Sequence, residues 1–297
     1  MNAHGKILDR TYLSIDQAED RGFIHRDYIS HCLRWSHVCK RLTERKLYQS
    51  ARILDVGCGR ELPLAKMLYS SKLIPQHYWG VDVGPIKDSE LQKINGTGKF
   101  PIDVWENQNF LNLGHADFKF GAMAPDQDLP PNFVICFEVL EHVEPAMMID
   151  MLRHMLKLTT DDCQYFISTP CWNKVDCAAN HVNEMTHEAL GAVLEAVGFE
   201  VVNVYGTFAS IRDYEHLLGM YHLQTTFQEL RQYYDTNFLS CVFAPLFPAQ
   251  SRNCLWELRR AYAKNKQLPI SKFKPLSKLQ TPWGSSENWR DMEKCYA

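Results

Sequence analysis

The sequence has no apolar run long enough to cross a bilayer and no strong excess of either charge. Its longest apolar stretches, such as 242–247, fall far short of the roughly 18–20 residues of a membrane span. Residues 1–17 alternate charge and polarity and lack the apolar centre of a signal peptide. The formal net charge is −3, from 32 Lys and Arg against 35 Asp and Glu. Global charge therefore gives no reason to expect nucleic-acid or membrane binding.

Metal-binding and disulfide patterns of cysteine are also missing. The ten cysteines are scattered, without a CxxC pair, which argues against a thiolate zinc site and against a secreted disulfide framework. We therefore expect reduced thiols in a cytoplasmic protein. A content of 45% hydrophobic and 23% charged residues is typical of globular proteins and excludes coiled coils, collagen-like repeats and wholesale disorder. The length of 297 residues allows one large domain or two small ones.

The segment 28–47 shows the periodicity of an amphipathic helix. The residues at helical spacing are Tyr28, Cys32, Trp35, Val38, Cys39 and Leu42. Such a helix either packs on the core or forms a lid over a site, and the pattern allows both interpretations.

Strands and helices alternate from residue 51 onward. Apolar strand patterns lie at 52–56, 78–82, 132–137, 164–168, 198–205 and 253–258. Helical patterns start at Leu62 and cover 145–158 and 186–197, where Thr186 is the expected N-cap. This alternation predicts an α/β fold with a doubly wound, mostly parallel, seven-stranded Rossmann-like sheet.

Two stretches interrupt the alternation and suggest a domain organisation. We expect an N-terminal helical extension (1–49), an α/β domain (50–261) with a helical cap insertion (207–250), and an extended basic tail (262–297). Seven Lys or Arg and no acidic residue occur within 259–278. That run is either a solvated tail or a segment that contacts phosphates.

The strongest functional signal is the run Ile53-Leu-Asp-Val-Gly-Cys-Gly59, placed directly after a strand and before a helix. Glycines at such a turn let backbone N–H groups approach a ligand without obstruction by a Cβ atom. Asp82 ends the next strand, 23 residues past Gly59, where a ribose diol would bind. The two features together predict a nucleoside-containing cofactor.

The glycine run, Asp82 and the segment Cys136-Phe-Glu-Val-Leu-Glu-His-Val143 together resemble class I S-adenosylmethionine-dependent methyltransferases, in particular type 11/12-like members. The similarity spans roughly residues 50–205. It implies S-adenosylmethionine as the cofactor, with Asp82 on both ribose hydroxyls. The residues expected around its methionine part are Asp55, Gly57, Cys58 and Gly59, with Phe137 also on the cofactor side.

Two further cofactor contacts follow from the resemblance. Asp117 and Phe118 are the candidates for an acid and an aromatic residue that hold the adenine. Glu61 stands where a small residue is common, so it either contacts the amino group of the cofactor or signals a turn of different shape.

Glu138, Glu141 and His142 stand at positions i, i+3 and i+4, and His181 follows a later strand that ends at the same sheet edge. Two carboxylates and imidazole suit Mg²⁺, Mn²⁺ or Zn²⁺. The layout resembles metal-dependent 2′-O-methyltransferases of small-RNA 3′ ends and ubiquinone-pathway O-methyltransferases, which implies all four as ligands. The same motif is widespread in metal-free members, so both interpretations stay open.

We expect methyl transfer to an oxygen or nitrogen of a small molecule or nucleotide, with Glu138, His142 and His181 positioning or deprotonating the acceptor. One alternative is a nucleic-acid methyltransferase that binds through the basic tail. Another is a cofactor-binding, non-catalytic partner subunit. Trp172 and Asn173 are candidates for the acceptor pocket or for loop packing. The same alternatives hold for the aromatic residues of the cap, which are Tyr214, His216, Tyr221, His222, Tyr233 and Tyr234.

Overall fold

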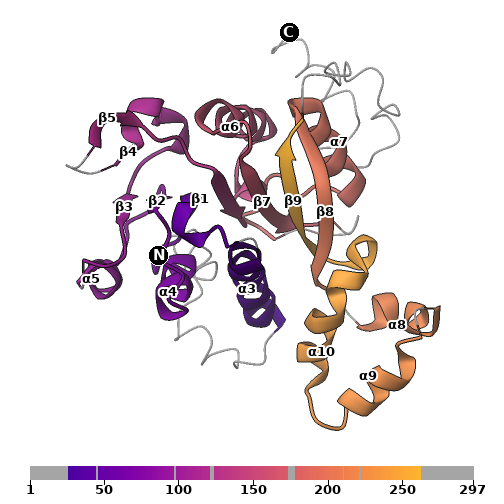
Figure 1. The fold of residues 1–297 in the computed structure, drawn as a ribbon. Helices are drawn as coiled ribbons and strands as arrows, with labels where there is room; N and C mark the ends of the chain where they lie inside the picture. The colour runs from indigo at the N-terminus through magenta and orange to yellow at the C-terminus, as the bar shows by residue number, and fades with distance from the viewer. Residues whose placement is uncertain are drawn as a thin grey trace, which may run out of the picture.

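A seven-stranded sheet forms the centre of the molecule (Figure 1). The computed structural model describes residues 26–44, 46–96, 98–120, 124–172, 178–209, 211–220 and 222–261. The strands, in spatial order, are β3 (Ile102–Trp105), β2 (His77–Val81), β1 (Arg52–Val56), β6 (Phe133–Phe137), β7 (Gln164–Pro170), β9 (Asn253–Arg260) and β8 (Phe199–Phe208). Only β9 runs antiparallel to its neighbours within this sheet. The predicted doubly wound, mostly parallel sheet is confirmed.

The strand order reverses between β1 and β6, which places the carboxyl ends of β1, β2 and β6 at one edge. Open α/β sheets bind their ligands at such a switch point. A separate two-stranded sheet pairs β4 (Lys119–Phe120) with β5 (Ala124–Asp128). Neither β3 nor this small sheet was predicted.

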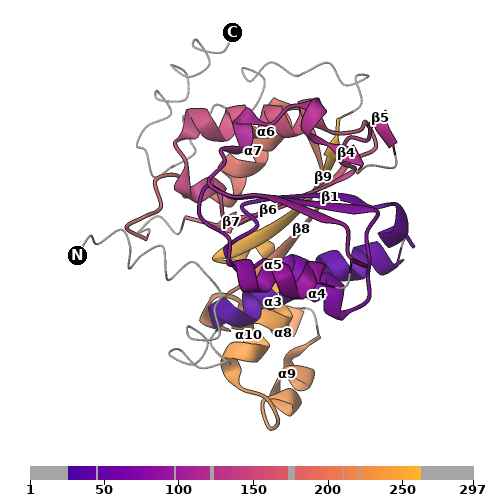
Figure 2. The same cartoon turned by 90° about the vertical axis from the view of Figure 1, so that its left-hand side faces the viewer.

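Helices cover both faces of the large sheet, as Figure 2 shows in an edge-on view. The helices are α3 (Arg26–Glu44), α4 (Pro63–Ser70), α5 (Asp88–Asn95), α6 (Pro145–Leu158), α7 (His187–Val197), α8 (Ile211–Met220), α9 (Gln224–Leu230) and α10 (Thr236–Phe243). Short 3₁₀ turns lie at η1 (Tyr48–Ser50), η2 (Phe110–Asn112), η3 (His115–Asp117), η4 (Leu140–His142), η5 (Ala244–Leu246) and η6 (Pro248–Gln250). α6 and α7 cover one face, and α3, α4 and α5 cover the other.

The alternation of side chains along the strands explains the two layers. In β1, Leu54 faces the apolar cluster that α6 and α7 complete, whereas Ile53 faces the cluster beneath α3 and α4. α6 has the predicted bounds, with Pro145 in its first turn. α7 begins after Thr186, whose side chain accepts a hydrogen bond of 3.2 Å from the Ala189 N–H, so the predicted N-cap is confirmed.

The insertion between β8 and β9 forms α8, α9 and α10 beyond the edge of the sheet (Figure 1). These helices share an apolar cluster of their own, in which Tyr214 is fully buried and stacks on Phe247 at a ring distance of 4.8 Å. Tyr233 and Tyr234 are exposed. Tyr214 therefore packs as the structural alternative expected.

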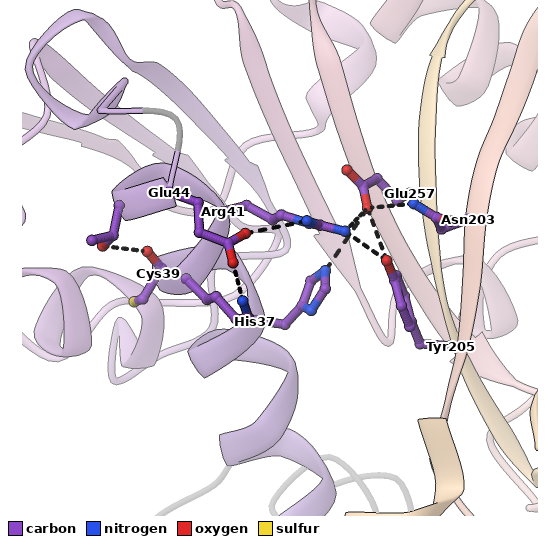
Figure 3. Close-up of polar contacts among 9 residues, drawn as sticks. His37, Cys39, Arg41, Glu44, Asn203, Tyr205 and Glu257 are labelled. Atoms are coloured by element: carbon purple, nitrogen blue, oxygen red, sulfur yellow. Dashed lines mark hydrogen bonds and ion pairs between the residues drawn. The ribbon is translucent and has the colours of Figure 1, made fainter. Parts of the chain in front are cut away.

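A buried ionic cluster attaches α3 to the sheet (Figure 3). Glu257 on β9 is 2% exposed and receives Arg41 of α3 at 3.0 Å from its Nη2 atom. The same nitrogen donates to the Tyr205 hydroxyl at 2.6 Å, while Asn203 donates to Glu257 at 3.3 Å and His37 lies 3.9 Å away. Charged and polar groups thus join α3, β8 and β9.

The predicted extended tail (262–297) and residues 1–25 lie outside the described residues. Two members of the basic run lie on β9 and are paired: Arg259 with Glu200 at 2.5 Å, and Arg260 with Asp161 at 3.5 Å. Across the described parts of the chain, no helix combines the length and the apolar character that a bilayer span requires.

Candidate active site

A glycine turn follows β1, as predicted from the run that ends at Gly59. Gly57 has φ +73° and Gly59 has φ +72°, the left-handed region that favours glycine. A Cβ atom on Gly57 would lie 2.3 Å from Cγ2 of Val139, so no larger residue fits. The turn leads into α4 and lines the cavity described below.

Asp82 follows β2 and holds two loops together. One carboxylate oxygen accepts the Gly59 N–H at 2.9 Å, and the other accepts the Gly84 N–H at 2.8 Å. Burial raises the pKa of Asp82, and these two hydrogen bonds act in the opposite direction. Each oxygen keeps lone-pair capacity, which would suit the two hydroxyls of a ribose.

Asp55 lies deeper, at the carboxyl end of β1. It is 5% exposed and accepts a hydrogen bond from the Tyr78 hydroxyl. Burial raises the pKa of Asp55 to about 7, helped by the charge of Asp82, although the Tyr78 hydrogen bond acts to lower it. A carboxyl group so placed is poised between its charged and neutral forms near neutral pH.

These groups line a cavity of about 410 Å³ at the switch point. The predicted site residues among its walls are Asp55, Gly57, Cys58, Gly59, Glu61, Asp82, Phe137, Glu138 and His142. Its size suits a small ligand or cofactor. Glu61 lies 3.6 Å from Lys66 and 3.7 Å from Lys87, so its charge is already shared with two cations.

Asp117 and Phe118, the predicted adenine contacts, do not line this cavity. Phe118 is fully buried, where it packs edge-on against Trp79 and Trp105 at ring distances of 5.2 and 5.9 Å. Asp117 instead accepts the Gly114 N–H at 2.7 Å, at the surface of its own 3₁₀ turn. The aromatic ring serves the core between β2 and β3, so it is not available to a ligand.

Gln108, Asn109 and Phe110 occupy the cavity wall where Asp117 and Phe118 were expected. They follow β3, a strand of four residues whose pattern was too short to detect. The Asn109 side chain caps the next turn by accepting from the Leu111 N–H at 2.9 Å. An Asn that caps a turn after a weak strand is the sequence signal that could have located this loop.

Glu138 comes directly after β6 with φ +57°, a left-handed conformation that is uncommon for a residue with a side chain. Its Oε1 atom accepts from the Ser168 hydroxyl at 2.8 Å, and its Oε2 atom accepts from the Asn253 amide at 2.8 Å. Burial raises the pKa of Glu138, but the charge of Arg34, 3.7 Å away, leads the opposing effects that hold it below its ordinary value. Glu138 is therefore an anion in the cavity wall.

Three of the four predicted metal ligands, Glu141, His142 and His181, lie close together. One ligand atom of each lies within 4.8 Å of those of the other two, and the two imidazole rings meet edge-on at 4.8 Å. Glu141 is 1% exposed, and burial followed by the Glu138 charge raises its pKa well above the ordinary value. Glu138 is not in this group, because its two oxygens are engaged by Ser168, Asn253 and Arg34.

His142 belongs both to this group and to the cavity wall. Its Nδ1 atom lies 3.1 Å from the Asn180 carbonyl oxygen and 3.4 Å from the Asn180 amide nitrogen. The shorter contact requires the proton on Nδ1 and leaves Nε2 unprotonated. Burial lowers the pKa of His142, so the imidazole is neutral near pH 7.

His181 is positioned one layer behind the cavity. Its Nδ1 atom hydrogen-bonds to the Glu184 carboxylate, an arrangement that typically orients a ligating imidazole. His31 and Trp35 of α3 also line the cavity, so the N-terminal helix covers the site as well as the core. The predicted candidate Trp172 is not in the cavity wall, and Asn173 lies outside the described residues.

Comparison with known proteins shows the family to which the chain belongs. A family model described as "Methyltransferase domain" matches residues 28–204. The crystal structure of magnesium protoporphyrin IX methyltransferase from Synechocystis PCC 6803, with bound SAH, has a TM-score of 0.51 at 14% identity, covering 88% of this chain and 96% of that one. A 1,6-didemethyltoxoflavin-N1-methyltransferase from Burkholderia thailandensis has a TM-score of 0.46 at 13% identity, with coverages of 88% and 91%. No curated protein matches the sequence.

The fold, the glycine turn and the acidic strand end define a class I S-adenosylmethionine-dependent methyltransferase. The chain belongs to the methyltransferase-domain family, whose model covers more than half of its length. The predicted class of enzyme is thereby confirmed.

Proposed function

We propose that this enzyme methylates an oxygen or nitrogen atom of a small molecule or nucleotide, with His142 as the general base. The observation that carries the proposal is the position of His142 in the wall of the cofactor cavity with Nδ1 at 3.1 Å from the Asn180 carbonyl oxygen, a contact that places the proton on Nδ1 and leaves Nε2 to act as the base. A hydroxyl is a poor nucleophile until a base removes its proton, and a positioned imidazole is a common solution.

The cofactor fits the residues at the switch point. Asp82 supports the ribose assignment because it lines the cavity and backbone N–H groups of two loops hold its carboxylate in place. The turn from Gly57 to Gly59 leaves space for the methionine part, with Asp55 and Phe137 nearby in the wall. When bound, S-adenosylmethionine supplies an activated methyl group, so the protein mainly has to align the acceptor and manage its proton.

The acceptor would enter beside His142, between α3 and the loop after β6. Its O–H or N–H proton would pass to Nε2 of His142 while the methyl carbon exchanges its bond to the cofactor sulfur for a bond to the acceptor atom, which leaves a neutral thioether. The Nδ1–H bond to the Asn180 carbonyl would stabilise the resulting imidazolium. The proton then leaves to water, which restores the base.

The experiment is a radiolabelled methyl-transfer assay across panels of small-molecule, nucleotide and RNA acceptors, with S-adenosylhomocysteine release as a second readout. We expect His142→Gln to lower turnover by roughly 10²–10⁴-fold without weakening cofactor binding. His154→Gln is the matched control, because His154 is also half-buried and hydrogen-bonds a carbonyl, that of Leu113, away from the cavity. Full activity of His142→Gln would exclude His142 as the base.

A metal-assisted version is a second candidate, favoured by the convergence of Glu141, His142 and His181. A divalent ion held by these three side chains would polarise an acceptor hydroxyl and replace His142 as the means of lowering its pKa. The carboxylate and two imidazoles are a suitable donor set for Mg²⁺, Mn²⁺ or Zn²⁺.

Chelation distinguishes the two versions. If a metal takes part, a strong chelator abolishes turnover, re-addition restores it, and Glu141→Gln or His181→Ala removes the divalent-ion dependence. Turnover that is unchanged by the chelator would exclude the metal and leave His142 as the base.

A nucleic-acid acceptor stays an alternative that depends on the basic run within 259–278, most of which lies outside the described residues. Salt-sensitive RNA or DNA binding that is lost on deleting 262–297 would support it. Absence of binding at low salt would exclude it. We also propose for this enzyme the domain limits given in the sequence analysis and a cytoplasmic location.

A further inference from the structure

A closed ring of buried polar contacts joins the N-terminal helix to the cavity. Arg34 of α3 donates from Nη1 to the Thr207 hydroxyl at 3.2 Å, and Thr207 donates to the Asn253 carbonyl oxygen at 2.9 Å. The Asn253 amide donates to Glu138 at 2.8 Å, and Arg34 Nη2 lies 3.7 Å from the other Glu138 oxygen. Each link fixes the orientation of the next.

Burial makes this ring rigid and electrostatically strong. Arg34 is 1% exposed, Thr207 5% and Asn253 6%, whereas the Glu138 side chain is 19% exposed and lines the cavity. Charges removed from water interact more strongly and depend more on their partners. Arg34 is the cation closest to the cavity-facing anion, and its helix also places His31 and Trp35 in the cavity wall.

Glu138 cannot be held by its own backbone alone. Its left-handed φ of +57° is a costly conformation for a residue with a Cβ atom, and such conformations persist where surrounding contacts determine them. Its direct contacts come from three elements, through Ser168 of β7, Asn253 of β9 and Arg34 of α3. Thr207 of β8 joins Arg34 to Asn253. Of these partners, Arg34 alone carries a charge.

We infer that Arg34 is a positioning residue that fixes the Glu138 carboxylate as an anion facing the sulfonium of bound S-adenosylmethionine. The inference rests on the proposed function. It makes the cofactor site selective for the positively charged form of the cofactor. The positive charge of the sulfonium disappears when the methyl group is transferred. A fixed anion therefore favours the substrate form of the cofactor and weakens retention of the neutral product.

The test compares calorimetric dissociation constants for S-adenosylmethionine and S-adenosylhomocysteine, measured without any acceptor. We expect the wild type to prefer the charged cofactor and Arg34→Gln to lower that preference about tenfold. Glu138→Gln should lower it at least as much, and the double variant should differ from Glu138→Gln by less than about twofold, because residues that act through one another are not additive.

Arg41→Gln is the matched control. It removes an arginine from the same helix that pairs with Glu257, outside the cavity wall, so it loosens the helix without touching Glu138. We expect its preference between the two cofactor forms to equal that of the wild type. Thermal unfolding and circular dichroism check that each variant is folded. If Arg34→Gln does not fold, Thr207→Val, which keeps the volume but removes the linking hydroxyl, should lower the preference in the same direction.

Three results would overturn the inference. The first is a wild type that binds both cofactor forms equally. The second is an equal effect of Arg34→Gln and Arg41→Gln on the preference, which would show a role in helix docking alone. The third is additivity of Arg34→Gln and Glu138→Gln. Because the readout needs no acceptor, a protein that loses the preference as expected but methylates nothing would contradict the proposed function and not this inference.

Discussion

Helix α3 meets the sheet through two arginine–glutamate pairs that look alike and differ in their surroundings. Arg41 pairs with Glu257 at 3.0 Å among Asn203, Tyr205 and His37 (Figure 3). Arg34 lies 3.7 Å from Glu138, whose carboxylate also faces a cavity. In the first pair the anion is buried and the arginine is partly exposed, whereas in the second the arginine is buried and the anion borders the cavity. The same chemistry thus holds the helix at one end and prepares a site at the other.

The backbone separates the two pairs further. Glu257 is in the middle of a regular strand, whereas Glu138 has a left-handed φ of +57° just past a strand end. Strained residues that the surroundings hold in place are common at functional sites. We therefore assign a stabilising role to the contacts around Glu257 and a functional role to the polar contacts around Glu138. The following substitutions test that assignment.

The largest effect is expected at Glu138. Glu138→Gln keeps the shape of the side chain but removes the charge that favours the sulfonium form, so S-adenosylmethionine binds more weakly and kcat/KM for the cofactor should fall by roughly 10²-fold. Initial rates at saturating acceptor and varied cofactor concentration measure the effect. Glu257→Gln is the control and should turn over at the wild-type rate per folded molecule. A similar loss in both variants would break the distinction between the two regions.

The free energy of unfolding, in contrast to turnover, should respond to substitution of Glu257. Glu257→Gln leaves the Arg41 charge without its buried anion, and breaking such a pair costs about 3 kcal/mol. Urea unfolding at pH 7, followed by tryptophan fluorescence, measures the loss. Glu257→Gln with unchanged stability would mean that the cluster orders α3 without stabilising the fold.

The pH dependence of stability tests whether ionised Glu257 stabilises the fold. Burial raises the pKa of Glu257, but His37, Asn203 and Arg41 outweigh it and bring the value to about 2. Because the folded-state pKa lies below the ordinary 4.5, its stabilising contribution is complete above about pH 5 and is lost as the pH falls toward 2. The difference in unfolding free energy between wild type and Glu257→Gln should therefore shrink from pH 5 to pH 2. A constant difference over that range would contradict the assigned ionisation.

The part of the site that follows local sequence rules was predictable. A strand, a glycine turn and a helix are specified by neighbouring residues, and so is an acid at the next strand end, so Gly57, Gly59 and Asp82 were located correctly on the cavity wall. α6 and the Thr186 cap are equally local. Such features depend on few long-range contacts.

The parts that depend on distant residues were not predictable. Arg34 lies within an amphipathic helix pattern, and its partners Glu138 and Thr207 are 104 and 173 residues away along the chain. Phe118 follows a poorly patterned segment, and only the packing of Trp79 and Trp105 decides that its ring belongs to the core. Tertiary contacts override a local motif in both cases.

The smallest effect is expected at a third ion pair of the same helix. Lys40 and Glu44 are four residues apart at the surface, with side chains 62% and 42% exposed. Water and salt screen such a pair, and ordering two long side chains offsets much of their attraction. Lys40→Ala should therefore leave the unfolding midpoint, the cofactor affinities and turnover unchanged within error. A clear loss in any of these would show that burial is not what distinguishes the three pairs, because this pair shares their helix and chemistry and differs in its exposure to water.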